Sequence, residues 1–393
     1  MNYLIYIVAA IFGGSASFAH ASDDMSVKGF LTLGATASDQ EKFYDKYTNH
    51  SVNFYNESRF GINFSRTLSE QYSVSAQIVS NGGDDTGHIL PDFAFASYYA
   101  NSNWTIRAGI HPFPIWLISD RKDIGKLYPW VTPPEEVYTL QPLRNYSGVN
   151  TSYRYETGNW QIEPEIFGGG AFGDTGRRDA RAHVILSNLI GSSLTISNEY
   201  LKLRSAFVRG NASVETELFT IERIDTHFIN FGSQIEYKNF LVLAEYARIG
   251  NTIDEGERKR ARQAASQALA DALAGNGNLD TVGTIAKGTT VDTSYATGNA
   301  AYITVGYQMD DFLGHVTYAS LDTPRDPLTI NSQNSAALGL KYDLSLFTDI
   351  KFEVKKINLG ENSWGLYHYD LQNDDVTKFE DLTVVKAAMD FIF

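Results

Sequence analysis

The chain has 393 residues, a formal net charge of −14 and no cysteine, and it is rich in Tyr (23), Phe (23) and Gly (32) against only 10 Pro. The acidic balance argues against a nucleic-acid partner, since proteins of that class are usually basic, and the absence of cysteine excludes disulfide bonds. A chain of this length can bury a large core or close a membrane barrel without cross-links, and its aromatic residues are of the kind that strands favour.

The first residues predict export. Residues 3–18 form an uncharged apolar run, which Ala19-His20-Ala21 and a polar segment follow. An A-x-A pattern after such a run predicts a signal peptide over residues 1–21, cleaved after Ala21. The alternative is a transmembrane anchor, but the run is short and is interrupted by Gly13 and Gly14. No later segment approaches 18 uninterrupted apolar residues. An exported chain of this kind is a soluble secreted protein or a membrane barrel.

Sixteen later segments alternate apolar and polar residues with the period of a strand. Around Arg107, for example, Trp104, Ile106 and Ala108 alternate with polar residues and glycine. A β-sandwich shows similar alternation, but its strands rarely run for ten or more residues with charge on one face throughout. The predicted strands are 26–37, 57–68, 71–80, 91–101, 103–110, 146–157, 159–168, 180–190, 192–203, 227–237, 239–250, 299–309, 312–322, 334–344, 348–359 and 381–393.

The gaps between these strands alternate in length. Tight turns are predicted at 69–70, 101–103, 158–159, 238–239 and 310–311, and long segments at 38–56, 111–145, 204–226, 251–298, 323–333 and 360–380. Short turns on one side and long loops on the other are typical of an outer-membrane barrel. The sequence therefore predicts an all-β fold, a transmembrane antiparallel β-barrel of about 16 strands over residues 22–393, with short periplasmic turns and long extracellular loops.

The last strand ends in Phe393 and has two unlike faces. Val385, Met389 and Phe391 lie on an apolar face, whereas Lys386 and Asp390 lie on the other. This pattern suits lipid on one side and water on the other. We expect the last strand to pair with the first and close the barrel, because an uncovered apolar edge invites aggregation.

With these features the chain resembles a Gram-negative outer-membrane porin of the sixteen-stranded type over the whole of 22–393. The resemblance implies that the third loop on the long side, 111–145, folds inward and narrows the pore. It also implies recognition of the terminal Phe393 strand by the barrel-assembly machinery, and a homotrimer. General porins carry a Pro-Glu-Phe-Gly type motif in this loop, but here residues 129–138 read PWVTPPEEVY. The chain is thus a divergent branch, to which the known constriction residues of the family cannot be transferred.

Segment 111–145 carries the most concentrated chemistry. It holds six of the ten prolines, which lower the entropy lost when a loop adopts one shape. We expect a rigid plate inside the barrel that sets pore size and local field; the alternative is an external loop or a subunit contact. Its candidate constriction residues are Arg121, Lys122, Lys126, Glu135 and Glu136, and its candidate stacking groups for a solute are Trp116, Tyr128, Trp130 and Tyr138.

Strand parity places further charges on the lumen side, because a charge at mid-membrane on the lipid face costs about 2–4 kcal/mol. One interpretation sets a basic wall against the loop carboxylates Glu135 and Glu136. The other is a hydrated wall whose charges are paired. The basic candidates on the wall are Arg59, Arg107, Arg154 and Arg181.

Segment 254–275 has apolar residues at helical spacing and a basic start at 258–262. It is a rim helix or, alternatively, a basic cap that binds lipopolysaccharide phosphates.

Acidic runs at Asp84-Asp85 and 370–381 are solvated loop charges or divalent-cation contacts. Enzyme motifs are absent from the sequence, and Asp84, Asp85 and His88 near one strand end are the residues to test for a hydrolase. Neither a metal site nor a cofactor is predicted.

The sequence therefore predicts a porin in the Gram-negative outer membrane, passing small hydrophilic solutes and ions passively through a water-filled channel. Outer-membrane lipid and lipopolysaccharide are its expected surroundings. A substrate-specific channel, for example for sugars, is the alternative, and a barrel enzyme or adhesin is a third hypothesis.

Overall fold

The computed structural model describes residues 25–45, 48–82, 90–141, 143–175, 182–215, 220–253, 297–323, 331–361, 363–367 and 379–393, with single positions between 256 and 267. The signal segment 1–21, the hydrolase candidates near Asp84, Arg181 and most of the loop 251–298 lie outside these residues, so predictions about them stay predictions. Among the described residues no helix is long and apolar enough to cross a membrane.

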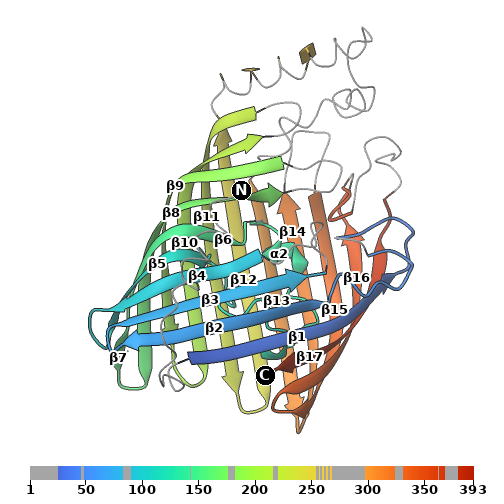
Figure 1. Ribbon diagram of the computed structural model, residues 1–393. Coiled ribbons are helices and arrows are strands. Elements are labelled where there is room, and N and C mark those ends of the chain that lie inside the picture. Colours follow the sequence, from blue (N-terminus) through green and yellow to red (C-terminus); the bar gives the residue numbers. More distant parts are fainter. Residues whose placement is uncertain are drawn as a thin grey trace, which may run out of the picture.

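The strands form a single antiparallel sheet that closes on itself (Figure 1). They are β1 (Met25–Ser38), β2 (Arg59–Ser69), β3 (Tyr72–Asn81), β4 (Leu90–Tyr99), β5 (Trp104–Pro112), β6 (Asn145–Tyr153), β7 (Tyr155–Thr157), β8 (Trp160–Thr175), β9 (Ala182–Ser197), β10 (Leu201–Glu215), β11 (Thr220–Tyr237), β12 (Phe240–Ile253), β13 (Gly298–Met309), β14 (Phe312–Thr323), β15 (Asn331–Ser345), β16 (Thr348–Leu359) and β17 (Leu382–Ile392). Both β6 and β7 pair with β8, so they occupy one position in the wall and the barrel has sixteen strands, as predicted.

The first and last strands close the ring. They pair in register from Phe30 opposite Ile392 to Ser38 opposite Val384. Beyond the strand, Phe393 exchanges two backbone hydrogen bonds with Gly29, of 2.7 and 2.9 Å. The Phe393 ring lies over Gly29 where a side chain would otherwise stand. Closure leaves no unpaired edge, and the predicted pairing is confirmed.

The two faces of β17 behave as their parity predicts. Lys386 and Asp390 are at most 4% exposed and point into the barrel, whereas Val385 is 39% and Phe393 is 65% exposed. The same alternation continues around the wall through the register of each strand pair. Lysines and carboxylates therefore line the lumen, while aromatic and aliphatic residues face outward.

One predicted turn is wrong. The sequence placed a break near Gly191 and a long loop at 204–226, but β9 runs through to Ser197 and β10 covers Leu201–Glu215. Gly191 lies inside β9, where the ring of Phe167 occupies the space that a side chain would need. The turn falls at Asn198, whose side-chain oxygen accepts the backbone N–H groups of Tyr200 and Leu201, both at 2.9 Å. This is an Asx-type turn.

The other tight turns lie where they were predicted, and Gly158, Lys238 and Asp310 have the positive φ that such turns need. The break predicted between the strands 334–344 and 348–359 is also confirmed, because the turn falls at Leu346-Phe347 between β15 and β16. Two large apolar residues carry no turn signal, but these two are 85% and 60% exposed at the end of the hairpin.

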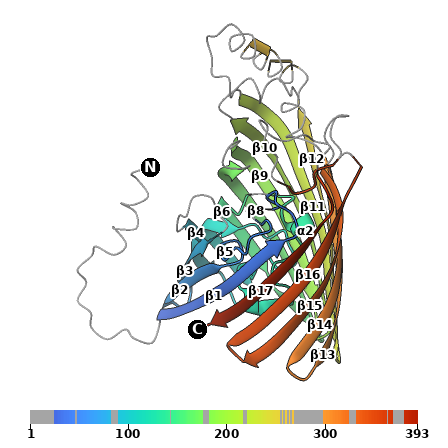
Figure 2. The same ribbon diagram turned by 90° about the vertical axis from the view of Figure 1, so that its right-hand side faces the viewer.

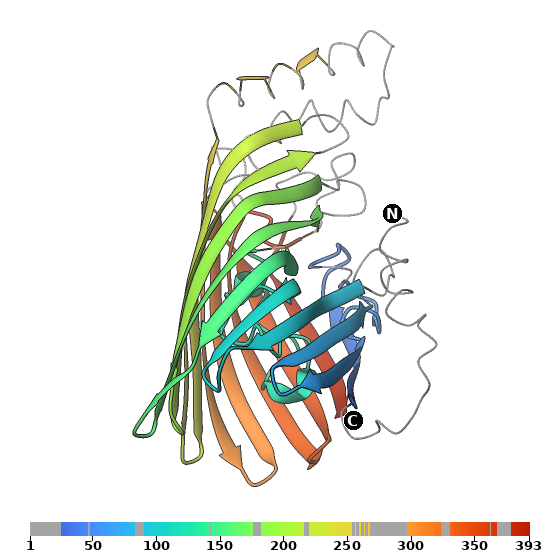
Figure 3. The same cartoon turned by 60° about the vertical axis from the view of Figure 1, so that its left-hand side comes forward.

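The wall differs in height around the ring. Strands β2–β5 have 9–11 residues, close to the minimum of about 9–11 that spans the hydrocarbon. Strands β8–β11 have 15–18 residues. Figure 3 shows these green and yellow strands rising far above the blue strands β1–β4. The barrel thus has a low side and a tall side.

The segment after β5 folds into the barrel, as the resemblance predicted. We call residues 113–144 the inward loop, because His111-Pro112 and Asn145 belong to the strands. It contains a short 3-10 helix η1 (Gly125–Leu127) and a single helical turn α2 (Glu135–Tyr138). In Figures 1 and 2, α2 lies between the front and back walls of the barrel.

The contact between Gly191 and Phe167 can be tested by Gly191→Val. We expect the added side chain to displace the Phe167 ring and lower the free energy of unfolding by about 1–3 kcal/mol, the usual cost of overpacking. Gly314→Val is the matched control, since Gly314 is also in a strand and has open space around it. Urea midpoints of the two variants in detergent measure the difference, and equal midpoints would contradict it.

Candidate functional site

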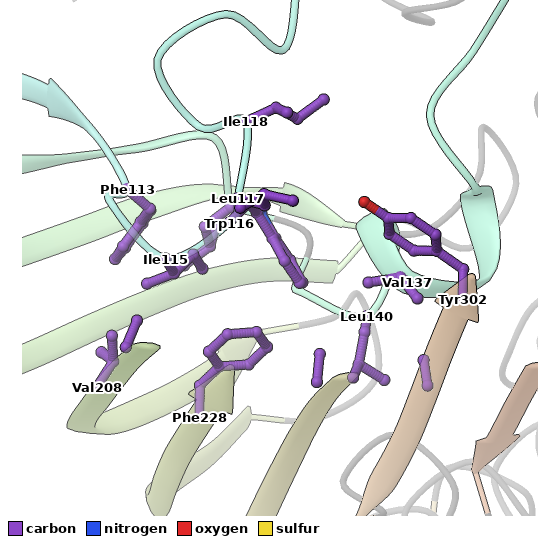
Figure 4. Packing of buried hydrophobic residues seen from close by; sticks show 14 of the residues in the cluster. Phe113, Ile115, Trp116, Leu117, Ile118, Val137, Leu140, Val208, Phe228 and Tyr302 are labelled. Carbon is purple, nitrogen blue, oxygen red and sulfur yellow. The ribbon is translucent and has the colours of Figure 1, made fainter. Parts of the chain in front are cut away.

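The inward loop packs its apolar side chains against the inner face of the tall wall. Leu117 and Val137 have no exposed surface and belong to one core with residues of β8–β14. The Trp116 ring meets Phe228 of β11 edge-on, with 5.0 Å between the ring centroids. Figure 4 shows these loop side chains directed at Val208, Phe228 and Tyr302 of the wall. Burial of this apolar surface holds the loop inside the lumen.

Trp130 is fixed by polar contacts as well as by packing. Its indole Nε1 donates to the hydroxyl oxygens of Thr304 (2.9 Å) and Thr317 (3.0 Å), on the adjacent strands β13 and β14. Its ring also packs edge-on against Tyr302, at 5.4 Å between centroids. A buried indole needs such a hydrogen-bond partner, so Trp130 has a defined position.

Glu245 of β12 joins the two ends of the inward loop. Its carboxylate accepts the backbone N–H of Leu117 near the loop's start (2.7 Å) and the hydroxyl of Tyr138 near its end (2.7 Å). The side chain of Asn230 donates a third bond, at 3.0 Å. These donors offset the cost of burying the carboxylate.

The other side of the inward loop is held by ion pairs with the wall of β16 and β17. Lys355 contacts Glu135 at 2.5 Å and Glu136 at 2.9 Å. Lys386 contacts Glu135 and also Glu57, the latter at 2.9 Å. All five side chains are at most 6% exposed. Such buried pairs are directional, so they set the position of α2 against the wall.

Glu135 lies outside the spanning strands, and two opposing effects act on its pKa. Burial alone would raise the pKa of this carboxyl, but Lys355 and Lys386 hold it well below its usual range. Such a group stabilises the fold fully above its unfolded pKa of about 4.3. That stabilisation is lost as pH falls through the lowered folded value. The pairs therefore stay charged at neutral and mildly acidic pH.

A second ionic group holds η1. Lys351 of β16 donates to the backbone oxygen of Gly125 at 2.5 Å and pairs with Asp390 at 3.0 Å. A side chain at residue 125 would collide with Asp390, so glycine permits this close approach. Lys126 bonds Asp343 of β15 on the same wall.

Gln333 of β15 links α2 to segments beyond the strand ends. Its side-chain nitrogen donates to Glu136 (2.8 Å) and to the hydroxyl of Tyr44 (2.7 Å). Its side-chain oxygen accepts the backbone N–H of Leu366, at 3.0 Å. The buried amide uses both of its polar atoms, so the segments around Tyr44 and Leu366 are tied to the inward loop.

The structure separates the arginines predicted to line the pore. Arg59 donates to the backbone oxygen of Val131 (3.2 Å) and so fastens the inward loop. Arg154 is 53% exposed and lies 3.6 Å from Glu163. Arg107 lies on β5 with its guanidinium over the ring of Phe95, at 5.9 Å from the centroid. Arg181 lies outside the described residues.

The charged candidates of the inward loop serve mainly as anchors. Arg121 donates to Gln234 of β11 at 2.7 Å, and Lys126 bonds Asp343. Burial would raise the pKa of Asp123, but Arg144 and then Lys122 hold it below its usual value. One of the two predicted arrangements set a basic wall of arginines against Glu135 and Glu136. Their bonds run instead to Lys355 and Lys386, which is the alternative of paired wall charges.

The candidate stacking rings lie in the core. Trp116, Tyr128 and Trp130 are at most 4% exposed, and Tyr138 is held by Glu245. The structure therefore presents three of these rings to other side chains rather than to water, and the stacking role predicted for them is not supported.

Sequence reasoning missed Arg204, which it placed in a loop. Arg204 lies in β10, donates to the backbone oxygen of Pro114 (2.7 Å) and approaches Glu165 at 3.6 Å. Leu201, Leu203 and Phe207 lie on one face and Lys202 and Arg204 on the other, a pattern that signals a strand continuing past residue 203. Arg204 thus fastens the start of the inward loop.

The bonds given above gather on one arc of the barrel. They reach β2 and β10–β17, and on β3–β5 they reach Asp92, which lies 3.5 Å from Arg144. The inner face of β4–β6 carries Ser97, Arg107 and Asn150, which are neighbours in register. The solute path of a channel would lie along the inner face of β4–β6, where fewer of the bonds to the inward loop are made.

No known protein-family model matches the chain, and no curated protein matches it in sequence. Solved structures match it in fold. OmpT, an outer membrane protein of Vibrio cholerae, has a TM-score of 0.54 and 10% identity over 95% of this chain and 99% of that chain. An anion-selective porin from Comamonas acidovorans has a TM-score of 0.54 and 10% identity over 94% of this chain and 99% of that chain. Salmonella typhi OmpF has a TM-score of 0.54 and 11% identity over 94% of this chain and 97% of that chain. At such identity the likeness shows a shared fold, which confirms the predicted resemblance.

The ion pairs of α2 can be tested by Lys386→Met. Removing one partner of a buried pair leaves an uncompensated charge, so we expect a loss of about 3–5 kcal/mol in the free energy of unfolding. Lys356→Met is the control, since Lys356 is exposed on the outer face of β16. Urea unfolding in detergent measures both. The double variant Lys386→Met/Glu135→Gln should recover part of the loss. If the losses of the two single variants simply add in the double variant, the pairing is contradicted.

Proposed function

We propose that this chain, whose barrel has the fold of sixteen-stranded outer-membrane porins, forms a channel for passive diffusion of small hydrophilic solutes and ions. The observation that carries the proposal is a closed barrel with a charged lumen face and a loop fastened inside it. A lumen lined by lysines and carboxylates suits water, and an inward loop restricts the size of what passes.

The field in such a channel comes from the charges that the fold leaves unpaired. Glu135, Glu136 and Lys126 neutralise wall residues of opposite sign, so they contribute little net field. Of the predicted pore-lining residues, Arg107 is the one we assign to the solute path. Arg154 near the periplasmic turns is a weaker candidate, because Glu163 lies beside it.

We propose the outer membrane of a Gram-negative cell as the location. The outward faces carry apolar and aromatic side chains, among them Tyr72, Trp104, Phe240 and Phe312 beside the tight turns. Such residues suit a girdle at the membrane interface. Recognition of the Phe393 strand by the assembly machinery and lipopolysaccharide contacts remain parts of this proposal, as does cleavage of residues 1–21. The proposal assigns the channel no catalytic step.

Association into a homotrimer is supported by the low side of the barrel. Strands β2–β5 barely span the hydrocarbon, so burying them against other subunits would avoid distortion of the bilayer. One solved form of the Vibrio cholerae OmpT is a trimer.

The trimer is tested by light scattering of the detergent-solubilised protein. We expect a protein mass of three chains after subtraction of the detergent. A mass of one chain under conditions that preserve strand content would contradict the trimer without affecting the channel proposal.

The channel is tested by recording currents across a planar lipid bilayer. Pure folded protein should produce stepwise conductance increases, because each insertion adds a water-filled path. Protein denatured before addition is the control. The proposal fails if folded protein, shown by circular dichroism to keep its strands, inserts into the bilayer without any conductance.

A further inference from the structure

Arg107 is a charge that the fold does not use. It lies on the lumen face of β5, in register with Ser97 on β4 and Asn150 on β6. Among the residues that the structure describes, it has no hydrogen-bond or ion-pair partner, and its guanidinium lies over the Phe95 ring. Arg59, Arg154 and Arg204, also on the lumen face, each have an oxygen partner. An arginine held on a ring still has its in-plane N–H donors available for a carboxylate.

A row of rings lies beside this guanidinium. Phe95 stacks on Phe93 at 5.3 Å and on His111 at 5.1 Å between centroids. His111 in turn packs on Tyr146, at 5.2 Å. Phe93 and Phe95 are only partly buried, whereas His111 and Tyr146 are buried. The partly exposed rings offer a flat apolar surface next to the positive charge.

Two buried polar atoms at this row have no partner among the described residues. They are Nε2 of His111 and the side-chain oxygen of Asn150, and both residues are 3% exposed. Buried polar atoms are nearly always bonded in folded proteins. Asn150 lies directly opposite Arg107 in register, and His111 lies four residues further along β5 on the same face. These unsatisfied atoms on the face of Arg107 mark a place built for a polar ligand.

The neighbouring carboxylate does not neutralise Arg107. Glu165 of β8 accepts hydrogen bonds from Asn150 and from Ser193. It also faces Arg204, at 3.6 Å. Its charge is therefore matched by Arg204, and the patch keeps the positive charge of Arg107.

We propose that Arg107, Phe95, His111 and Asn150 form a lumen binding site for aromatic carboxylates. This inference rests on the proposed channel and names the class of solute that it favours. The carboxylate bonds the guanidinium, and the aryl group lies against Phe95 and Phe93. The buried unsatisfied atoms of His111 and Asn150 bond water that accompanies the solute. A site of this kind concentrates the solute on the free arc of the wall and lets it leave by diffusion.

The test compares three probes in single-channel recordings: benzoate, its neutral analogue benzamide, and acetate. Benzoate should interrupt the current in a concentration-dependent way. Benzamide and acetate should block more weakly, because benzamide lacks the negative charge and acetate lacks the aryl ring. Arg107→Gln should weaken the benzoate affinity by about tenfold or more, as expected for a charge-assisted bond. Phe95→Leu should weaken benzoate but leave acetate unchanged.

The matched control is Arg248→Gln, since Arg248 is exposed on the outward face of β12. It should leave the benzoate affinity within about twofold, a change below 0.5 kcal/mol at the 1.4 kcal/mol per tenfold scale. The inference is overturned if benzamide blocks as well as benzoate, or if Arg107→Gln and Arg248→Gln behave alike. Circular dichroism confirms that each variant is folded.

Failure of the channel can be told apart from failure of the site. If the folded protein does not conduct, the proposed function is lost, and equilibrium dialysis of labelled benzoate against the detergent-solubilised barrel tests the site alone. Binding that Arg107→Gln abolishes would support the site without a channel. Absence of benzoate binding by the wild-type barrel would overturn it, whatever the conductance.

Discussion

The pairing of β1 with β17 is the constraint on which the rest of this structure depends. Within hydrocarbon, every backbone N–H and C=O must find a partner in the protein, and only a closed sheet provides this for strands. Once the ring is closed, each residue faces either lipid or lumen, and its parity decides which. A lysine such as Lys386 then has one favourable direction, which is inward. The ion pairs that hold the inward loop are thus consequences of closure.

The inward loop is fastened by two kinds of interaction with different roles. Apolar burial against β8–β14 is strong but non-directional, so it keeps the loop in the lumen without setting its register. The bonds from Lys351, Lys355 and Lys386 have fixed partners and set where η1 and α2 lie. Glu245 adds a third element, because it binds both ends of the loop and so limits how far either can move. A loop held on two walls is suited to a fixed opening, and Gln333 extends that rigidity to the segments around Tyr44 and Leu366.

Sequence could predict what depends on local periodicity. The inward direction of Lys386 and Asp390 followed from alternation, and the inward loop followed from its position after the fifth strand. Sequence could not predict the partners, because Glu135 and Lys386 are far apart along the chain and several lysines were equally available. Gly191 was mistaken for a turn because a strand glycine that receives a ring looks the same in sequence as a turn glycine. Arg204 was lost with that error, since the misplaced turn ended its strand too early. Trp130 was taken for a solute contact because exposure is a property of packing, which no local pattern records.

The division between used and unused charges separates the parts of the lumen that hold the fold from those that face a solute. A carboxylate such as Glu135 cannot attract a passing ion while two lysines surround it, because its field is cancelled within a few ångströms. Arg204 and Arg107 show the contrast on one wall: both are lumen arginines, but Arg204 bonds Pro114 and approaches Glu165, while Arg107 rests on a ring. Selectivity in such a barrel is therefore governed by the residues that folding leaves without partners. Among the described lumen arginines Arg107 is such a residue, and in the proposed channel it would decide which solutes are retained.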